Sequence, residues 1–315
     1  MSEKIPLLVL AGPTAAGKSA LAMRLAPLLN TDIISADSAQ VYRGLDIGTA
    51  KPTAEEQKLV RHHLIDLAYP DEDYSVADYQ RDARRVIEEL WSRGRLPFLA
   101  GGTGLYLQAV IDNYAFGKSG GDRALRERLS AEADSKGPEA LHERLKMIDP
   151  AAAEKIHPRD RRRIIRALEV FILEGRPISE QPVLTRQQES PYQVLIFGLT
   201  LPRPQLYRSI EDRVETMMAQ GFFEEVQMLL RRGYSRSAPG MQVLGYRQLA
   251  ACIDGEMTRE EALAEIKKET RRLAKRQLTW FRRDPRIVWL NRSTENGLEK
   301  LAETISRQVK EIFVY

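Results

Sequence analysis

This 315-residue chain has almost no cysteine and no long apolar run. The single Cys252 excludes an internal disulfide and a cysteine-based zinc site, and it agrees with a reducing compartment. No apolar run approaches the ~18 residues that a membrane-spanning helix requires, and the N-terminal residues lack the pattern of a signal peptide. We therefore expect a cytoplasmic globular protein without membrane association, long enough for about two domains.

The most informative motif is a phosphate-binding loop, or P-loop. Residues 12–19 read GPTAAGKS and lie between an apolar run at 7–10, typical of a buried parallel strand, and a helical pattern at 19–29. In such a loop the backbone N–H groups and the helix N-terminus face an anion. Lys18 is expected to reach the terminal phosphates, and the Ser19 hydroxyl to bind Mg²⁺. The candidate anion-binding residues are Gly12, Pro13, Thr14, Ala15, Ala16, Gly17, Lys18 and Ser19.

The charge is small in total but unevenly distributed. The formal net charge is +4, yet residues 159–166 contain five arginines and residues 267–283 form a dense series of lysines and arginines. Such clusters are typical of solvated helix faces. In a protein that binds phosphates, two of them also favour a polyanionic partner.

The hydrophobic pattern predicts an α/β fold. Strands are expected at 7–10, 32–35, 96–100, 194–199 and 286–290, and long helices at 19–29, 76–91, 204–230, 258–283 and 298–312. The block 122–174 is helical and strongly charged. We therefore expect residues 1–113 and 194–315 to form one core domain, and residues 114–193 to form a helical insertion domain.

An acidic residue directly follows the second predicted strand. A carboxylate at Asp37, facing a P-loop, can bind a metal or accept a proton from a nucleophile. It can equally cap the N-terminus of a helix. The Gly- and Thr-rich run at 44–52 suggests a second phosphate-facing loop. The strand at 96–100 runs into glycines at 101–104, and open α/β folds place ligand sites at such strand ends.

Together, these motifs resemble those of the bacterial tRNA dimethylallyltransferases, also called tRNA isopentenyltransferases. The resemblance runs in order from about residue 6 to residue 283. The motifs that carry it are GPTAAGKS at 12–19, ISADSAQVYRGLDIGTAKP at 34–52, HHLID at 62–66, GGTGLY at 101–106, RRIIRALEV at 162–170, VLGYRQ at 243–248 and KRQLTWFRR at 275–283.

This resemblance implies transfer of a dimethylallyl group from dimethylallyl diphosphate to N6 of the adenosine 3′ of the anticodon in tRNA. It implies a nucleotide-kinase-like P-loop core with a parallel sheet, an insertion that helps to clasp the anticodon stem-loop, and Mg²⁺ as cofactor. Asp37 matches the family's general base, and Lys18, Thr103 and Arg213 match its other catalytic positions. We expect a monomer with no obligate protein partner.

The resemblance also implies which residues contact tRNA. Tyr246, Trp280 and Phe281 are candidates for stacking on bases, although packing in the core explains them equally well. The implied contacts are Asp37, Ser38, Ala39, Gln40 and Thr103 near the target base; Arg126, Arg162, Arg163, Ile164, Ile165 and Arg166 in the insertion; Gln242, Val243, Leu244, Gly245, Tyr246 and Arg247; and Lys275, Arg276, Gln277, Leu278, Thr279, Trp280, Phe281 and Arg282.

The chain departs from the family pattern at three places. Arg162 stands where many relatives have Gln, Gln242 stands where some have Arg, and the spacing at 112–121 makes the alignment of Arg126 uncertain. Three other functions share parts of the pattern. They are an isopentenyltransferase that acts on free AMP, ADP or ATP, a P-loop kinase of small molecules, and an RNA-binding protein switched by GTP or ATP.

Overall fold

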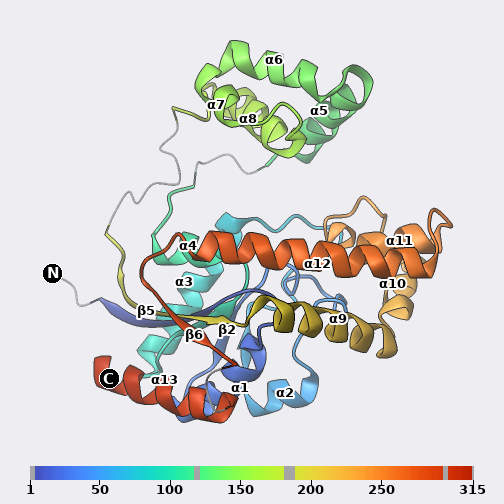
Figure 1. Cartoon of the computed structure of the whole chain (residues 1–315). Coiled ribbons are helices and arrows are strands. Elements are labelled where there is room, and N and C mark those ends of the chain that lie inside the picture. The colour runs from blue at the N-terminus through green and yellow to red at the C-terminus, as the bar shows by residue number, and fades with distance from the viewer. Residues whose placement is uncertain (1–3, 117–120, 181–188, 294–296, 314–315) are drawn as a thin grey trace. The chain divides into compact units, whose positions relative to one another are not determined.

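The computed structural model describes residues 4–116, 121–180, 189–293 and 297–313. The chain divides into two compact units (Figure 1). Unit 1 combines Met1–Ile111 with Ser190–Tyr315, and unit 2 is Asp112–Glu189. The sequence pattern places the same two divisions near residues 113 and 194.

Unit 1 contains a six-stranded sheet in which every pair of neighbours is parallel. This confirms the predicted α/β class. The order of strands is β3-β2-β4-β1-β5-β6, so non-consecutive strands become neighbours through helical crossovers. The strands are β1 (Ile5–Ala11), β2 (Ile33–Ala36), β3 (His62–His63), β4 (Phe98–Gly101), β5 (Tyr192–Thr200) and β6 (Ile287–Asn291).

Strand β1 is apolar along its whole length because both of its faces are covered. Leu7 and Val9 belong to one hydrophobic core, and Leu8 and Leu10 belong to another. Side chains alternate between the faces of a strand, so each core covers one face of the sheet. The buried carboxyl end of β1 therefore delivers the P-loop at a fixed position.

Helices cover both faces of the sheet (Figure 1). Reciprocal capping boxes begin α2, α3 and α12, in which Thr53, Ser75 and Thr258 pair with the acidic residue three positions later. The helices of unit 1 are α1 (Lys18–Leu28), α2 (Ala54–Leu59), α3 (Val76–Ser92), α4 (Gly104–Ile111), α9 (Arg203–Ala219), α10 (Phe222–Arg231), the 3-10 helix η1 (Gly240–Gln242), α11 (Tyr246–Ile253), α12 (Arg259–Phe281) and α13 (Leu298–Ile312).

The single long helix predicted at 204–230 is wrong, since the structure has two helices there. Helix α9 ends at Ala219, and α10 begins at Phe222. Gly221 between them adopts φ +99°, a left-handed conformation that a helix cannot contain and that glycine tolerates best. The hydrophobic periodicity continues across this break, and for that reason the pattern did not reveal it.

Unit 2 is a separate helical body. It contains α5 (Arg123–Lys136), α6 (Pro138–Ile148), α7 (Pro150–Lys155) and α8 (Arg161–Glu174), which surround a core of their own. Leu129, Leu145 and Leu168 are almost fully buried in that core. In both units, none of the helices within the described ranges is sufficiently long and apolar to span a bilayer.

Candidate active site

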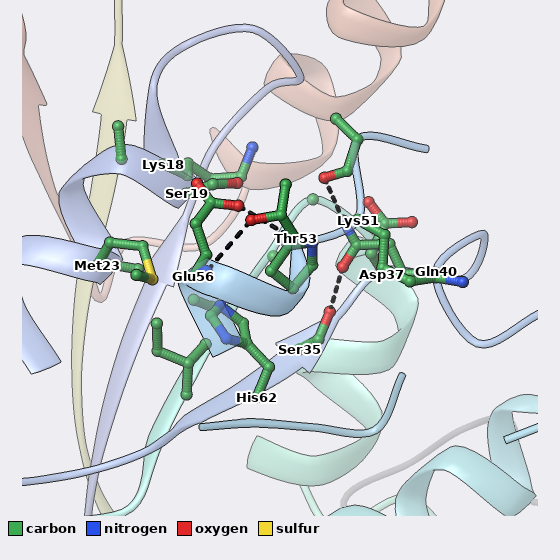
Figure 2. Close-up of a pocket in the computed structure, with 18 of the residues that line it drawn as sticks. Lys18, Ser19, Met23, Ser35, Asp37, Gln40, Lys51, Thr53, Glu56 and His62 are labelled. Atoms are coloured by element: carbon green, nitrogen blue, oxygen red, sulfur yellow. Dashed lines mark hydrogen bonds between the residues drawn. The ribbon is translucent and has the colours of Figure 1, made fainter. Parts of the chain in front are cut away.

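A cavity of about 900 Å³ opens in unit 1 where β1, β2 and β4 end. In parallel α/β sheets, this edge is where ligands bind. Figure 2 shows Lys18, Ser19 and Met23 on one side of the pocket, and Asp37 and Gln40 on the other. Further wall residues come from α2, from the loop at 46–53, from α9 and from α12.

The P-loop has the backbone that an anion-binding turn requires. Gly12 adopts φ +142°, and a Cβ there would lie 2.4 Å from the carbonyl oxygen of Leu199 in β5. Gly17 adopts φ +100° at the N-cap of α1, so the helix begins directly at Lys18. The loop is therefore closely packed against β5, with the N-terminal end of α1 lining the pocket.

Lys18 is a half-buried cation, and no carboxylate among the described residues lies within hydrogen-bond distance of it. Its ammonium group donates to the carbonyl oxygen of Pro13 at 2.7 Å. Burial lowers the pKa of Lys18 to about 8; Asp37 opposes this shift, and Arg213 contributes to it. A bound anion favours the charged amine, so the site gains full positive charge when a phosphate enters.

Asp37 follows β2 and lies in a turn, so the alternative of a helix N-cap is wrong. Its Oδ1 accepts from the backbone N–H of Ala39 at 2.9 Å. The next residue, Ser38, donates its backbone N–H to Oγ1 of Thr103 at 3.0 Å, and Thr103 donates its own N–H to the carbonyl of Ala36 at 3.1 Å. The structure thus joins the two predicted loops, one after β2 and one after β4, beside the cavity.

Gln40 and Arg213 meet at the loop that follows residue 48. Oε1 of Gln40 accepts from Oγ of Ser35 at 2.9 Å (Figure 2), and its Nε2 donates to the carbonyl of Ala50 at 3.2 Å. Arg213 of α9 donates to the carbonyl of Thr49 at 3.3 Å. Burial lowers the pKa of Arg213, and the Asp37 carboxylate opposes that shift. Two predicted site residues from distant parts of the chain therefore share one loop.

The Gly- and Thr-rich run at 44–52 lines the cavity, but its lysine is already occupied. Nζ of Lys51 contacts Oδ1 of Asp46 at 2.6 Å, Oδ1 of Asp66 at 2.7 Å and the carbonyl of Tyr42 at 2.8 Å. An ammonium group has three protons to donate, and here all three have acceptors. Lys51 therefore holds this loop in place, and Asp46 and Asp66 are the ion-pair partners through which it does so.

The side chain of Gln277 in α12 faces the P-loop. Its Oε1 accepts from the backbone N–H of Thr14 at 2.8 Å, and its Nε2 donates to the carbonyl of Gly102 at 2.9 Å. The family resemblance placed Gln277 among the tRNA contacts, and the sequence gave no sign of the contact with the P-loop. Its position shows that Gln277 holds the P-loop and the loop after β4 together.

The cations of α12 divide into two groups. Lys267, Lys268, Arg271 and Arg272 form ion pairs with glutamates. Lys275 and Arg276 near the C-terminal end of α12, and Arg282 directly after it, are exposed, and they form no ion pair in the described ranges. This second group remains available for an external anion.

The three aromatic residues predicted to stack on bases also fall into two groups, one buried and one exposed. Tyr246 and Phe281 are buried in the core, so neither ring offers a face to a base. The side chain of Trp280 is 38% exposed. Core packing therefore explains Tyr246 and Phe281, and Trp280 alone of the three has an accessible surface. Around them, Gln242, Arg247 and Thr279 are exposed, while Val243, Leu244 and Leu278 are partly buried and Gly245 is buried.

In unit 2, the arginines predicted to contact RNA lie on α5 and α8. Arg162 and Arg163 are exposed in the first turn of α8, whereas Ile164 and Ile165 belong to the unit's core. Glu169, fully buried, accepts from Nε of Arg126 at 2.7 Å and from Nη1 of Arg166 at 2.7 Å. The carboxylate thereby fixes the position of two of the predicted contacts.

A family model described as IPP transferase matches residues 40–284 of this chain. Two relatives named tRNA dimethylallyltransferase match it along nearly its whole length. That of Moorella thermoacetica is 53% identical over 92% of this chain and 90% of the relative. That of Pelotomaculum thermopropionicum is 48% identical over 97% of each.

Two solved structures are similar to this chain over nearly its whole length. The full-length tRNA isopentenylpyrophosphate transferase of Bacillus halodurans is 43% identical and superposes with a TM-score of 0.71, with 98% of both chains covered. A eukaryotic dimethylallyltransferase described as acting on tRNA is 26% identical, with a TM-score of 0.79; the match covers 98% of this chain and 79% of that one.

Proposed function

The chain belongs to the IPP transferase family, and on this basis we propose that its cavity joins a dimethylallyl group to tRNA. The chain is a prenyl transferase. Its reaction transfers the group from dimethylallyl diphosphate to N6 of the adenosine 3′ of the anticodon, with release of diphosphate. The observation that carries the assignment of roles is that Lys18, Asp37 and Arg213 line the same cavity.

The cationic side of the cavity suits the diphosphate. The bond from C1 of the dimethylallyl group to oxygen breaks, and the departing diphosphate keeps the electron pair. Lys18, Arg213 and the N–H groups of the P-loop would stabilise the charge that develops there. Because the cavity already holds these groups in place, little rearrangement accompanies the charge separation.

The opposite side of the cavity suits the acceptor. The lone pair of an adenine amino group is delocalised into the ring, so N6 is a weak nucleophile. As N6 bonds to C1, Asp37 would accept the proton that N6 loses. Thr103, whose Oγ1 is bonded to Ser38 of the same turn, would border the target base. General base assistance of this kind is typically worth ~10²–10⁴ in rate.

The donors in the cavity also fit Mg²⁺. The exposed residue Ser19 lines the cavity beside Lys18, and the parts of the chain that the structure describes contain no group of three or more metal-binding side chains. Mg²⁺ commonly binds one or two protein groups together with phosphate oxygens. Ser19 would hold the ion with the diphosphate, and the bound ion would supply charge neutralisation.

The tRNA surface of unit 1 would include Lys275, Arg276 and Arg282, since these exposed cations form no ion pair within the described residues. Trp280 adds an exposed aromatic ring on the same helix. In unit 2, Arg162 and Arg163 form an exposed cationic group at the start of α8. Contacts of this type neutralise RNA phosphates and weaken as salt rises.

A labelling experiment tests this function. The protein is incubated with Mg²⁺ and dimethylallyl diphosphate labelled in the allyl group, in parallel with an unmodified anticodon stem-loop, with free AMP, or with buffer. We expect label in the stem-loop, and none when the adenosine 3′ of the anticodon is replaced. Label in AMP would instead identify an enzyme of free nucleotides, and label in neither would refute transferase activity.

A further inference from the structure

Two sequence motifs that the reaction leaves unexplained meet at one buried carboxylate. The first is the loop at 44–52, and the second is the motif at 243–248, which contains Tyr246. Between them lies Glu225, in the first turn of α10, with 7% of its surface exposed. A buried carboxylate is costly unless hydrogen bonds surround it, so its partners reveal its role.

The carboxylate of Glu225 receives four hydrogen bonds. Its Oε2 accepts from the backbone N–H groups of Ile47 at 2.8 Å and of Asp46 at 3.1 Å, and its Oε1 accepts from that of Gly48 at 3.2 Å. The phenol of Tyr246 donates to Oε1 at 2.5 Å. Three consecutive N–H groups of a surface loop thus converge on one side chain from a helix about 180 positions later in the chain.

The aromatic rings beside this carboxylate leave room only for glycine. A Cβ on Gly48 would lie 2.1 Å from Cε2 of Phe222 and 2.6 Å from Cε2 of Tyr246, and one on Gly245 would lie 2.7 Å from Cζ of Phe222. The two rings pack edge to face, with centroids 4.9 Å apart. Gly48 of the first motif and Gly245 of the second are therefore explained by the close approach of these aromatic rings.

The next residues of this loop carry the carbonyl groups that hold two site residues. Thr49 accepts from Arg213, and Ala50 accepts from Gln40. The loop contains no helix or strand, and hydrogen bonds within its turn join the N–H of Ala50 to the carbonyl of Ile47 at 3.0 Å and the N–H of Lys51 to that of Asp46 at 3.0 Å. Glu225 anchors this turn to the rest of unit 1 on one side, and the ion pairs of Lys51 anchor it on the other.

We propose that Glu225 is a positioning residue for the transfer reaction: it fixes the loop at 46–48, and through the carbonyls of Thr49 and Ala50 it orients Arg213 and Gln40. This inference rests on the proposed function. Glu225 itself lines no part of the cavity. Burial and the neighbouring carboxylate raise the pKa of the Tyr246 phenol far above its ordinary value, so this group remains a donor throughout the working pH range.

The test substitutes Glu225→Gln, which preserves shape but leaves one carbonyl oxygen and one NH₂ group. The NH₂ group cannot accept, so either the two N–H groups at Oε2 or the donors at Oε1 lose their acceptor. Transfer to the anticodon stem-loop is measured with labelled dimethylallyl diphosphate. We expect kcat/KM for the stem-loop to fall about tenfold to a hundredfold, the range in which small misplacements of site groups act, while circular dichroism shows a folded chain at the assay temperature.

Glu224→Gln is the matched control, because Glu224 is the exposed neighbour in the same turn of α10. It should retain wild-type kinetics. A double-variant cycle with Gln40→Ala then distinguishes positioning from general damage. If Glu225 acts through Gln40, the double variant loses much less than the product of the two single losses. Fully multiplicative losses, or wild-type kinetics of Glu225→Gln, would overturn the proposal.

Should Glu225→Gln fail to fold, Tyr246→Phe replaces it. This change keeps the ring in the core and removes one of the two donors to Oε1, while the N–H of Gly48 remains. A rise in KM for the stem-loop in a folded chain supports the proposal, and unchanged KM and kcat refute it. The wild-type protein distinguishes failure of the positioning role from failure of the proposed function. If the wild type transfers no label to the stem-loop, the proposed function is refuted, whatever the role of Glu225.

Discussion

Gln277 of α12 and Thr14 of the P-loop are joined by a 2.8 Å hydrogen bond across 263 positions of sequence. The same amide group donates to the carbonyl of Gly102 at 2.9 Å. One side chain thus connects the loop after β1 with the loop after β4. The geometry of the P-loop therefore depends on a helix that also presents exposed cations to the surroundings.

Replacing Gln277 by Ala removes both hydrogen bonds. Each is worth about 1 kcal/mol net, so kcat/KM for dimethylallyl diphosphate should fall by about tenfold to thirtyfold. Steady-state kinetics with the diphosphate varied at saturating stem-loop measure this. Lys268→Ala, an exposed change on the same helix, is the control and should leave kcat/KM unchanged. Equal kinetics of the two variants would show that Gln277 does not support the P-loop.

Replacing Asp37 by Asn should lower kcat by about 10²–10⁴, because the amide cannot accept the proton that leaves N6. The affinity for the stem-loop should change little, since the base acts mainly in the transition state. Single-turnover rates and filter binding of labelled stem-loop measure the two quantities. Asp73→Asn, at an exposed loop position of unit 1, is the control. Turnover of Asp37→Asn near that of the control would exclude Asp37 as the base.

The pKa of Lys18, lowered to about 8, predicts how diphosphate binding depends on pH. A bound diphosphate favours the charged amine, so the pKa of Lys18 in the complex exceeds that in the free enzyme. Above pH 8 the free enzyme must take up a proton to bind, and affinity for inorganic diphosphate should fall with rising pH. Calorimetry in buffers of different ionisation enthalpy measures this uptake.

The ligand itself titrates, so Lys18→Gln provides the reference. Its weaker binding should keep only the pH dependence that belongs to the diphosphate. If the wild type and Lys18→Gln show the same proton uptake at pH 8.5, Lys18 does not titrate in the free enzyme as described.

Replacing Arg276 and Arg282 together by Gln should weaken binding of the stem-loop and flatten its salt dependence by up to about two phosphate contacts. Both side chains are exposed, and neither forms an ion pair within the described residues, although the charge of Arg276 acts on Glu269 from a longer distance. The control is Lys268 and Arg272 replaced together, because these cations are already paired with Glu265 and Glu269. A salt slope that changes equally in both variants would mean that the unpaired cations have no special role.

The sequence by itself determined the α/β architecture, and it predicted the chemistry of the P-loop. Its apolar runs predicted five of the six strands, because a parallel strand buried on both faces must be apolar at nearly every position. Gly12, Gly17 and the Lys-Ser pair at 18–19 predicted phosphate binding, because a P-loop is a local feature of consecutive residues. Asp37 could be selected because it immediately follows a strand. The family resemblance, which the comparisons confirm, added the reaction.

Only the tertiary structure decided which side chains serve the site and which serve the fold. Lys51 forms ion pairs with Asp46 and Asp66. Tyr246 donates a hydrogen bond to Glu225, and Gln277 accepts one from the P-loop. In α12, Lys268 and Arg272 pair with glutamates three positions away, whereas Lys267 and Arg271 pair with Glu215 and Glu211 of α9, which their own sequence neighbours could not reveal. A local pattern reflects constraints within a few residues along the chain. Hydrogen bonds and ion pairs depend on which distant segments the fold brings within about 3 Å.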